Sequence, residues 1–547
     1  MSYTSKTIMV LIILFLSQLI FGQAGNIDKE TIKKIDSLFN SYHHQKKTGS
    51  IISIIKNGKT VYNNKKGLAN IEHQIPITDS TAFNIASNSK QFAAFIALLM
   101  EEEGKLSFND DIRKHLPELS HLPKKITIKQ LANHTHGLPS PDELAQLKGV
   151  ETMHHKQVLE MLLNIKQVSF EAGEEHFYNN TGFILLAEII ERVGKKSFKQ
   201  QLKEKVFVPL KMHNTKVIDN KNTVVKNRAY SYRLQQDSTY ITNPAKLSTI
   251  GSSGIFTTID DLGLWVKNYQ NTTLGKREFY SKMQAITTLN SGKKTNYGLG
   301  LQVDTYKGID VVFHGGGTES YRSYILHAPK HQLSLVFLSN KGDMSGLDIM
   351  YGTLEIILKD FIQEEKTFTM LKGNELKKLE GTYQMFPGKY YNFIVENDKL
   401  YFQFFGSTGK YHFPQIGENT FNYPVAHHKI VFYENGLEFK AADMTYYCPK
   451  TDVKLVVLEN LNLNKFAGTY ENIEHNIQYK LVVKNNTLVA IHKNINYDIV
   501  LSPLSENSFH SYEAFFGKIE FTSNKNESIE SFKVSGQNLK DIVFKKL

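Results

Sequence analysis

The stretch Ser87-Asn88-Ser89-Lys90 lies where an extended segment ending near Ile85 gives way to the apolar-rich run 91–103. If that run is a helix, the Ser87 hydroxyl and the Lys90 amine lie on one face of its first turn. The dipole of the helix favours negative charge beside them. Ser87 is therefore a candidate nucleophile, and Lys90 is the group that would assist it.

The Ser-x-x-Lys spacing alone does not identify a site, because it also occurs at Ser53, Ser291 and Ser407. Ser53 falls in an alternating apolar run, and the other two lie in a polar loop and a glycine-bordered segment, so none of them opens a helix. A bare Ser-x-x-Lys is usually a helix cap followed by a solvated lysine. Support for Ser87 must come from the rest of the chain.

The composition is that of a soluble protein with more than one domain. At 547 residues the chain is too long for a single core, and 41% apolar and 22% charged residues are ordinary values. The formal net charge of +11 comes from lysines scattered among many acids, so no nucleic-acid partner is predicted. The sole cysteine, Cys448, rules out an intramolecular disulfide.

Residues 1–23 have the pattern of an export signal. Lys6 supplies positive charge, Ile8 to Ile20 form a short apolar core, and small residues follow at Gly22 and Ala24. The alternative is a retained membrane anchor, but the run is shorter than a bilayer requires and no second span follows. We therefore expect cleavage, a periplasmic or secreted protein, and no stable membrane span afterwards.

Residues 24–365 form the first predicted domain. Apolar residues at helical spacing predict a helix from Ile32 to Phe39, and Asn57-Gly58 predicts a tight turn between two strands. Further helical patterns follow, and four short apolar runs at 298–339 precede a last helix at 347–362. Strands at both ends of the domain with helices between them predict an α+β fold, with one antiparallel sheet flanked by helices.

The pattern changes from Leu371 onward to closely spaced short strands. The segment 376–383 is repeated at 463–470, and both copies end in Gly-Thr-Tyr. Such an internal repeat predicts two related all-β modules, at 372–458 and 459–547. Short strands in this number suit closed antiparallel barrels, which leave no exposed edge.

Two further motifs carry groups that acyl transfer to a serine requires. Tyr178 and Asn180 precede a helical pattern that starts at Thr181, so a phenol and an amide project from a connection. His314 is followed by three glycines, 315–317, at the end of an apolar strand, where a substrate backbone could approach closely. Taken singly, Tyr178 is more often a packed aromatic and His314 a turn histidine, so the inference depends on their combination.

In this order, the three motifs resemble those of the penicillin-recognising serine hydrolases, which include class C β-lactamases, D-Ala-D-Ala carboxypeptidases, D-aminopeptidases and related esterases. That family carries Ser-x-x-Lys, Tyr-x-Asn and, on an edge strand, Lys-Thr-Gly or His-x-Gly. The resemblance covers about residues 28–360 and implies a β-lactamase/transpeptidase-like fold with a helical subdomain. The C-terminal repeats resemble the lipocalin-like modules that follow the catalytic domain in several relatives. Further family-like stretches lie at 134–139, 177–191, 251–262 and 297–301.

The resemblance implies a role for each residue of the first two motifs. Ser87 would attack the substrate carbonyl and form an acyl-enzyme. Lys90 and Tyr178 would share the proton transfers, and which of them is the base stays open. Asn180 would hold the substrate amide.

The strand that carries His314 would supply the rest of the site. The backbone N–H groups of Ser87 and Gly317 would form an oxyanion hole, and Gly316 would let the substrate lie close. His314 would bind a substrate carboxylate or support Tyr178. It stands where class C β-lactamases have the lysine of Lys-Thr-Gly, so a permanent cation is missing, which disfavours antibiotic hydrolysis.

We therefore predict an exported serine hydrolase that cleaves an amide or ester bond in D-amino-acid peptides or small esters. A β-lactamase is one alternative, and a non-catalytic sensor or envelope-binding protein with a cell-wall polymer as its partner is another. No cofactor is predicted. No metal is predicted either, because Gly137 follows His134-x-His136 where a further ligand would be expected. An α/β-hydrolase is excluded because the chain has no Gly-x-Ser-x-Gly elbow.

Overall fold

The computed structural model describes most of the chain, and the expected signal peptide, 1–23, lies outside the described residues. Among the described helices, none has the length and apolar character needed to span a bilayer. The described ranges are 27–43, 47–150, 153–165, 167–244, 247–363, 367–405, 407, 409–423, 428–440, 445–454 and 461–547.

The first domain is built on a six-stranded antiparallel sheet in the order β12-β13-β14-β15-β1-β2. β1 pairs with β15 along its whole length, so the two ends of the domain meet inside the sheet. Asn57 and Gly58 join β1 to β2, and both have the positive φ that a tight hairpin turn requires. The fold class predicted from the sequence is confirmed. The strands are β1 (Ser50–Lys56), β2 (Lys59–Lys66), β12 (Gln302–Tyr306), β13 (Ile309–Thr318), β14 (Tyr321–Ala328) and β15 (Leu333–Ser339).

Helices cover both faces of this sheet. Ile52 and Ile54 of β1 point into one hydrophobic core, and Ile51 and Ile55 point into another, as the alternation of a strand dictates. The first core lies under α2 (Lys29–Ser41) and α11 (Gly346–Ile357), and the second contains α3 (Ser89–Glu102) and α9 (Ile259–Asn271).

The helix that follows Ser87, α3, is buried along almost its whole length. Its Gln91 Oε1 accepts hydrogen bonds from Trp265 Nε1 at 3.1 Å and from Tyr269 Oη at 2.9 Å, both on α9. Phe92 stacks on Trp265 with ring centroids 4.2 Å apart. Because these contacts satisfy the buried amide and fill the core, they fix the rotation of α3 and so hold the residues of its first turn.

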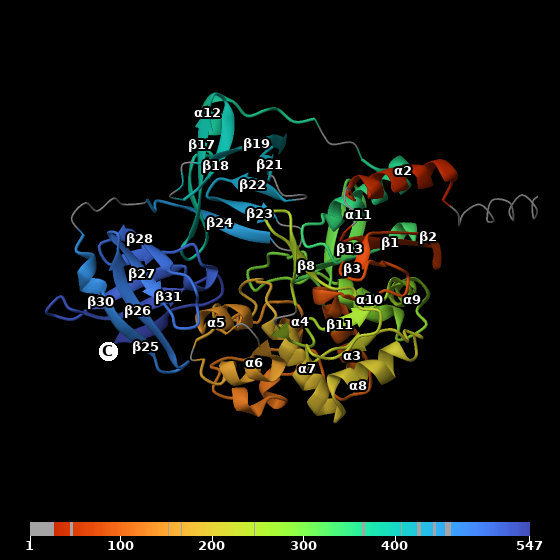
Figure 1. Ribbon diagram of the computed structural model, residues 1–547, viewed down its shortest axis with the longest axis horizontal. Helices are drawn as coiled ribbons and strands as arrows, with labels where there is room; N and C mark the ends of the chain where they lie inside the picture. The colour runs from red at the N-terminus through yellow and green to blue at the C-terminus, as the bar shows by residue number, and fades with distance from the viewer. Residues whose placement is uncertain are drawn as a thin grey trace, which may run out of the picture.

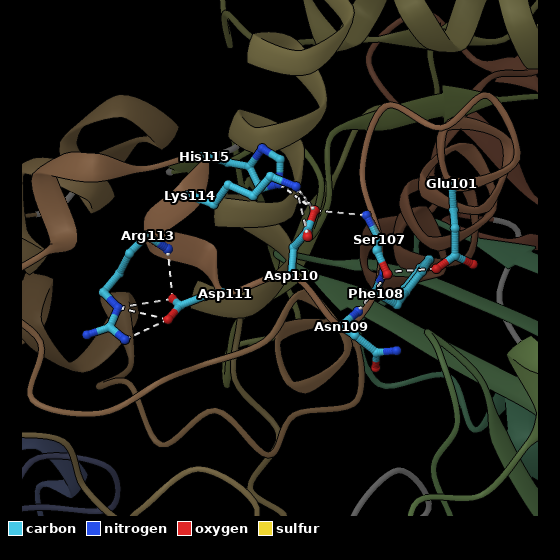
Figure 2. Close-up of polar contacts among 9 residues, drawn as sticks. All are labelled: Glu101, Ser107, Phe108, Asn109, Asp110, Asp111, Arg113, Lys114 and His115. Carbon is cyan, nitrogen blue, oxygen red and sulfur yellow. Dashed lines mark hydrogen bonds and ion pairs between the residues drawn. The ribbon is translucent and has the colours of Figure 1, made fainter.

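A carboxylate network fixes the segment that follows α3 (Figure 2). Asp110 accepts hydrogen bonds at 2.9 Å from the Ser107 N–H, the Lys114 ammonium and the His115 ring. Glu101 of α3 accepts the Phe108 N–H at 2.9 Å. Burial raises the pKa of Asp110, but the hydrogen bonds outweigh burial and lower it to about 2. Asp110 therefore stays ionised at neutral pH, and the Glu101 bond ties the following segment to the C-terminal end of α3.

A helical subdomain is inserted between the two halves of the sheet. Its helix α7 (Thr181–Gly194) packs closely on α4 (Ile128–Ala132), since a Cβ at Gly182 would lie 2.3 Å from Leu131 O. The other helices of the domain are α5 (Pro141–Leu147), α6 (His155–Leu162), α8 (Phe198–Leu202) and α10 (Arg277–Gln284). Short strands are β3 (Leu68–Asn70), β4 (Ile75–Pro76), β5 (Phe83–Asn84), β6 (Met153–His154), β7 (Lys216–Val217), β8 (Tyr232–Leu234), β9 (Tyr240–Thr242), β10 (Leu247–Ser248) and β11 (Ile255–Thr257).

The first C-terminal module follows α12 (Gly373–Lys377) and is a nine-stranded antiparallel sheet that runs from β19 at one end to β20 at the other. These end strands are consecutive in the chain and separated only by Pro414, which has no N–H with which to continue a ladder. The predicted closed barrel is therefore corrected to a nearly closed one. The strands are β16 (Gly381–Phe386), β17 (Lys389–Glu396), β18 (Lys399–Phe404), β19 (Lys410–Phe413), β20 (Gln415–Gly417), β21 (Thr420–Asn422), β22 (Lys429–Tyr433), β23 (Gly436–Lys440) and β24 (Thr445–Thr451).

The second module is a closed barrel, as predicted. Its first and last strands pair with each other, which leaves no free edge. Its strands are β25 (Gly468–Asn472), β26 (Ile477–Lys484), β27 (Thr487–Ile491), β28 (Ile499–Ser505), β29 (Ser508–His510), β30 (Lys518–Ser523), β31 (Ile529–Ser535) and β32 (Ile542–Lys546).

The sequence repeat corresponds to one local structure used twice. Tyr383 Oη donates to the carbonyl of Leu379 at 3.0 Å, and Tyr470 Oη donates to that of Phe466 at 2.8 Å. The glycine two residues before each tyrosine has a positive φ, +141° in one copy and +150° in the other. Each repeat therefore starts its barrel with the same tyrosine-anchored turn.

The two modules pack differently on the first domain (Figure 1). The second barrel lies beside α5, and its buried aromatic residues belong to the same hydrophobic core as α3 and α7. The first module has a core of its own. The modules also touch each other, since a Cβ at Gly388 of the first would lie 2.1 Å from the backbone of Gly517 in the second.

Candidate active site

Ser87 lies in a tight turn directly before α3. The turn is η1 (Ala86–Asn88), and Ala86 has a φ of +47°, a left-handed conformation that non-glycine residues rarely adopt. Asn84 Oδ1 accepts the Ala86 N–H at 2.8 Å, and the Asn88 amide donates to Ser323 Oγ of β14 at 2.8 Å. Strain that is held by surrounding bonds clusters at functional sites. Here it presents a partly exposed Ser87 hydroxyl.

Lys90 connects the nucleophile candidate to the rest of the site. Its side chain is fully buried, and Nζ donates hydrogen bonds to Ser87 Oγ at 3.1 Å, Asn180 Oδ1 at 2.9 Å and the Ser252 carbonyl at 3.0 Å. A lysine amine in its protonated form carries three hydrogen-bond donors. The three oxygens therefore hold the Lys90 nitrogen at one point, within reach of the Ser87 hydroxyl.

Tyr178 lies against the same nitrogen. Lys90 Nζ is 4.8 Å from the centroid of the Tyr178 ring, a distance at which a cation is attracted to the aromatic face. The buried His134 ring lies 4.3 Å from the Tyr178 ring, centroid to centroid. Burial and the neighbouring Lys90 hold the pKa of His134 well below its usual range, so this ring is neutral beside the phenol.

Asp142 is a buried acid that contacts Asn180. Asn180 Nδ2 donates to Asp142 Oδ2 at 2.8 Å, while Oδ1 of the same amide accepts from Lys90. Burial raises the pKa of Asp142 and outweighs the Asn180 hydrogen bond and the Lys90 charge, which act in the opposite direction. The sequence did not single out Asp142, because nothing in the local pattern 138–145 separates it from an ordinary first-turn acid.

His314 is buried, and both of its ring nitrogens have partners. Nδ1 faces the Gly315 carbonyl at 2.6 Å, so it carries the proton, and Nε2 therefore accepts from Tyr297 Oη at 2.9 Å. Burial, assisted by the Lys90 charge, lowers the pKa of His314 to about 3. A neutral His314 therefore supplies no cation for a substrate carboxylate. Its ring lies 6.0 Å from that of Tyr178.

The glycines after His314 form a free strand edge beside Ser87. The pairing of β12 with β13 ends at Phe313, whereas β14 pairs with β13 as far as Thr318. A Cβ at Gly316 would lie 2.3 Å from the Ile85 carbonyl and 3.2 Å from the Ser87 nitrogen. Only glycine permits this approach of the strand to the turn. Gly317 follows on the same edge.

The structure thus brings all the residues selected from the sequence into one region. Three contributors were not predicted: Asp142, the Ser252 carbonyl and Tyr297. Tyr297 and Ser252 lie within family-like stretches, so a closer comparison of those stretches could have found them. Within the described ranges, no three His, Cys, Asp or Glu side chains are grouped as a metal site would need.

A cleft of about 880 Å³ lies next to the site, where the first domain meets both modules. Its walls include His176 and Phe177, which directly precede Tyr178, and Tyr446 of the first module. The rings of Phe177 and Tyr446 lie 6.0 Å apart, centroid to centroid. Gln537 of the second module donates to Tyr446 Oη at 3.2 Å, so all three units meet at this wall.

Residues 35–351 match the family model described as Beta-lactamase, which covers more than half of the chain. The chain belongs to the Beta-lactamase family. Among curated relatives, Protein flp of Staphylococcus aureus (strain MRSA252) is 29% identical over 301 residues, 53% of this chain and 59% of flp. Penicillin-binding protein 4* of Bacillus subtilis (strain 168) is 28% identical over 330 residues, 56% of this chain and 72% of that protein. The chain thus spans about three fifths of the length of flp.

Solved structures share the fold. The octameric penicillin-binding protein homologue from Pyrococcus abyssi has a TM-score of 0.56 at 22% identity, covering 86% of this chain and 99% of its own. The D-amino acid amidase from Ochrobactrum anthropi SV3, complexed with D-phenylalanine, has a TM-score of 0.53 at 18% identity, covering 61% of this chain and 100% of its own. The likeness to the first structure extends beyond the β-lactamase-like domain into the C-terminal modules.

Proposed function

We propose that this protein is an exported serine hydrolase that cleaves an amide or ester bond through an acyl-enzyme on Ser87. The observation that carries the proposal is the position of Lys90 Nζ, 3.1 Å from Ser87 Oγ and shared with Asn180. A serine hydroxyl is a weak nucleophile near neutral pH, so it needs a neighbouring group that can accept its proton.

The reaction has two halves. Ser87 Oγ attacks the substrate carbonyl, and its proton passes to whichever of Lys90 and Tyr178 is unprotonated. That group then protonates the leaving amine or alcohol as the carbonyl re-forms. In the second half the group takes a proton from water, the resulting hydroxide attacks the acyl-enzyme, and the acid leaves as Ser87 regains its proton.

The backbone near Ser87 supports the charge that develops on the substrate oxygen. We assign the oxyanion hole to the N–H groups of Ser87 and Gly317, with Gly316 allowing the strand edge to lie against the Ser87 turn. Asn180 has one amide proton left after its bond to Asp142, and this proton is available to a substrate carbonyl. The substrate would lie along the free edge that starts at His314.

The substrate class follows from the charges around this edge. A neutral His314 favours substrates without a carboxylate at this position, which makes D-amino-acid amides, peptides and small esters better candidates than penicillins. The fold likeness to a D-amino acid amidase agrees with this choice. A β-lactamase activity is the alternative that the same assay addresses.

The export signal and the division into domains complete the proposal. Residues 1–23 would be a cleaved signal peptide, 24–365 the hydrolase domain, and 372–458 and 459–547 the two modules. One of the curated relatives is named a penicillin-binding protein, so a cell-wall polymer is a further candidate partner.

A substrate panel tests the proposal. The purified protein is incubated with D-alanine amide, D-alanyl-D-alanine, p-nitrophenyl acetate and a chromogenic cephalosporin, and initial rates are compared with those of Ser87→Ala. We expect the amide and the ester to be turned over and Ser87→Ala to be inactive. Faster cephalosporin hydrolysis would assign the protein as a β-lactamase, and equal rates in Ser87→Ala would exclude Ser87 as the nucleophile.

A further inference from the structure

A chain of polar contacts leads from Asp142 to the nucleophile candidate. Asp142 Oδ2 accepts from Asn180 Nδ2 at 2.8 Å, Asn180 Oδ1 accepts from Lys90 Nζ at 2.9 Å, and Lys90 Nζ donates to Ser87 Oγ at 3.1 Å. Asp142 is thus linked to Ser87 through two side chains and does not itself touch it.

The contact with Asp142 decides which way the Asn180 amide points. An amide presents an acceptor on one side and donors on the other, and a half-turn exchanges them. Asp142 Oδ2 accepts the Asn180 N–H, and the ammonium of Lys90 only donates hydrogen bonds. With Asp142 on one side and Lys90 on the other, one orientation satisfies both partners, and the reverse orientation satisfies neither.

The helix that carries Asp142 is held by the second barrel. α5 has only seven residues, too few to be stable in isolation. Glu143 Oε2 accepts the backbone N–H of Asn538 at 2.8 Å, and the Leu147 carbonyl accepts from Tyr479 Oη at 2.9 Å. Both donors belong to the second barrel, one at each end of α5. Glu143 is itself only 7% exposed, so this contact lies inside the interface.

We propose that Asp142 is a positioning residue that sets the orientation of the Asn180 amide, and that the second barrel is part of the active-site scaffold because it holds α5. The inference rests on the proposed function for its kinetic readout, but the orientation of the amide can be tested without activity. It assigns a catalytic purpose to a module whose sequence suggests only a β-barrel.

The first test compares Asp142→Ala with the parent. We expect the rate of acylation by p-nitrophenyl acetate to fall by about 10- to 100-fold, with a smaller change in KM, because the amide loses its fixed geometry. Removing a carboxylate near Lys90 also withdraws a charge that stabilises the protonated amine, so the acid limb of the pH–rate profile should move to lower pH. Asp142→Asn, which keeps an acceptor but not the charge, should retain more of the rate while showing the same shift in pH.

Asp261→Asn is the matched control. Asp261 is 3% exposed, and its Oδ2 accepts hydrogen bonds from the Asn214 N–H and the Thr215 hydroxyl at 2.8 and 2.7 Å, but it has no contact with Asn180 or Lys90. We expect a lower melting temperature with an unchanged pH–rate profile. If Asp142→Ala keeps the parent's kinetics, or if Asp261→Asn shows the same change in profile, the positioning role is wrong.

The second test addresses the barrel. Tyr479→Phe removes only the hydroxyl that donates to the Leu147 carbonyl of α5. Tyr470→Phe is the control, because its hydroxyl donates to the Phe466 carbonyl within the barrel. We expect faster hydrogen exchange in α5 and a roughly threefold lower acylation rate for Tyr479→Phe alone, since small misplacements lower reactivity. Equal α5 exchange and equal rates in the two variants would show that the barrel does not hold the site.

A crystal structure of Asp142→Ala separates this inference from the proposed function. The inference predicts that the Asn180 amide turns or leaves Lys90 Nζ, whether or not the protein is an active hydrolase. An unchanged Asn180–Lys90 contact overturns the inference while leaving the proposed function intact. Absence of turnover and of Ser87 acylation in the parent overturns the proposed function, and the crystal structure and α5 exchange still decide the positioning role.

Discussion

The two C-terminal modules arise from one sequence repeat, yet they stand in different relations to the first domain. The second closes into a barrel and merges its hydrophobic core with that of the domain, whereas the first stays nearly closed around a core of its own. The second contacts α5, which carries Asp142, and the first contributes Tyr446 to the wall of the cleft. Both modules line the cleft, and the second is in addition bonded to α5.

The largest difference should appear when each core is damaged in the same way. Phe516 in the second module is 0% exposed, and Phe432 in the first module is 2% exposed. Truncation of either residue to alanine should lower the free energy of unfolding of its own module by about 3–5 kcal/mol. Phe516→Ala should also lower the temperature at which hydrolase activity is lost, because its core continues into the first domain.

Phe432→Ala should melt the first module early while the activity survives. Thermal melts followed in parallel by hydrogen exchange and by ester hydrolysis measure both effects. If activity is lost at the same temperature in both variants, the distinction between a shared and a separate core is wrong.

Two glycine substitutions sharpen the comparison at the interfaces. A Cβ at Gly536 would lie 2.3 Å from the Ala514 carbonyl and 3.2 Å from Glu143 Oε2, on the α5 side of the second barrel. A Cβ at Gly388 would instead strike Gly517, where the two modules meet. We expect Gly536→Ala to lower kcat about 10-fold and Gly388→Ala to change it by less than about twofold. Steady-state kinetics on one ester measure kcat for both variants. A larger fall in kcat for Gly388→Ala than for Gly536→Ala would contradict this expectation.

The stability of the protein should depend on pH through Glu143, which lies in the interface between α5 and the second barrel. Burial raises the pKa of Glu143 to about 8, opposed by the Asn538 hydrogen bond and assisted by the Asp142 charge. The folded state therefore holds a proton that the unfolded state releases above about pH 4.5, so this contribution to stability falls as pH rises from about 4.5 to 8. The slope would be at most about 1.4 kcal/mol per pH unit. Glu143→Gln should flatten it in urea titrations across this range, and an unchanged slope would count against a buried protonated Glu143.

The interface of the first module should respond to pH in the opposite direction, with the smallest effect. Burial raises the pKa of Glu438, but Lys293, which bonds it at 3.1 Å, and Lys440 outweigh burial and lower it. Its contribution is present above the ordinary glutamate pKa and is lost as pH falls below it. Lys293 is exposed, so Lys293→Met should lower the free energy of unfolding by about 1 kcal/mol or less. Hydrogen exchange of β23 at pH 4 and pH 7 measures this, and greater protection at pH 4 would contradict it.

The sequence predicts the parts of the site that local patterns encode. Ser87 and Lys90 share one turn, and Tyr178 and Asn180 share one connection, so each pair is visible as a local pattern, and the combination of the two patterns with His314 selects them. The α+β fold follows in the same way from strands at both ends of the domain. The sequence pattern does not show that the sheet of the first module stays open between β19 and β20. That opening depends on Pro414, which separates these two strands.

The contacts that connect distant segments could not be predicted. Glu143 and Asn538 are 395 positions apart, and the donor is a backbone N–H, so no side-chain pattern marks the pair. Tyr297 lies beside His314 because β12 and β13 pair from Gln302 and Phe313 onward, which brings the segment before β12 near the residues after Phe313. Asp142 resembles any acid in the first turn of a helix until α7 places Asn180 beside it.

The central claim is that Ser87 is a nucleophile activated by Lys90 and Tyr178. Its most direct test is to incubate the protein with a fluorescent penicillin, an activated ester and a fluorophosphonate, and to locate the adduct by peptide mass spectrometry. We expect a covalent adduct on Ser87 with at least one probe, and a strongly reduced rate of labelling in Lys90→Ala. An adduct on another residue, or no adduct with any of the three, would contradict it.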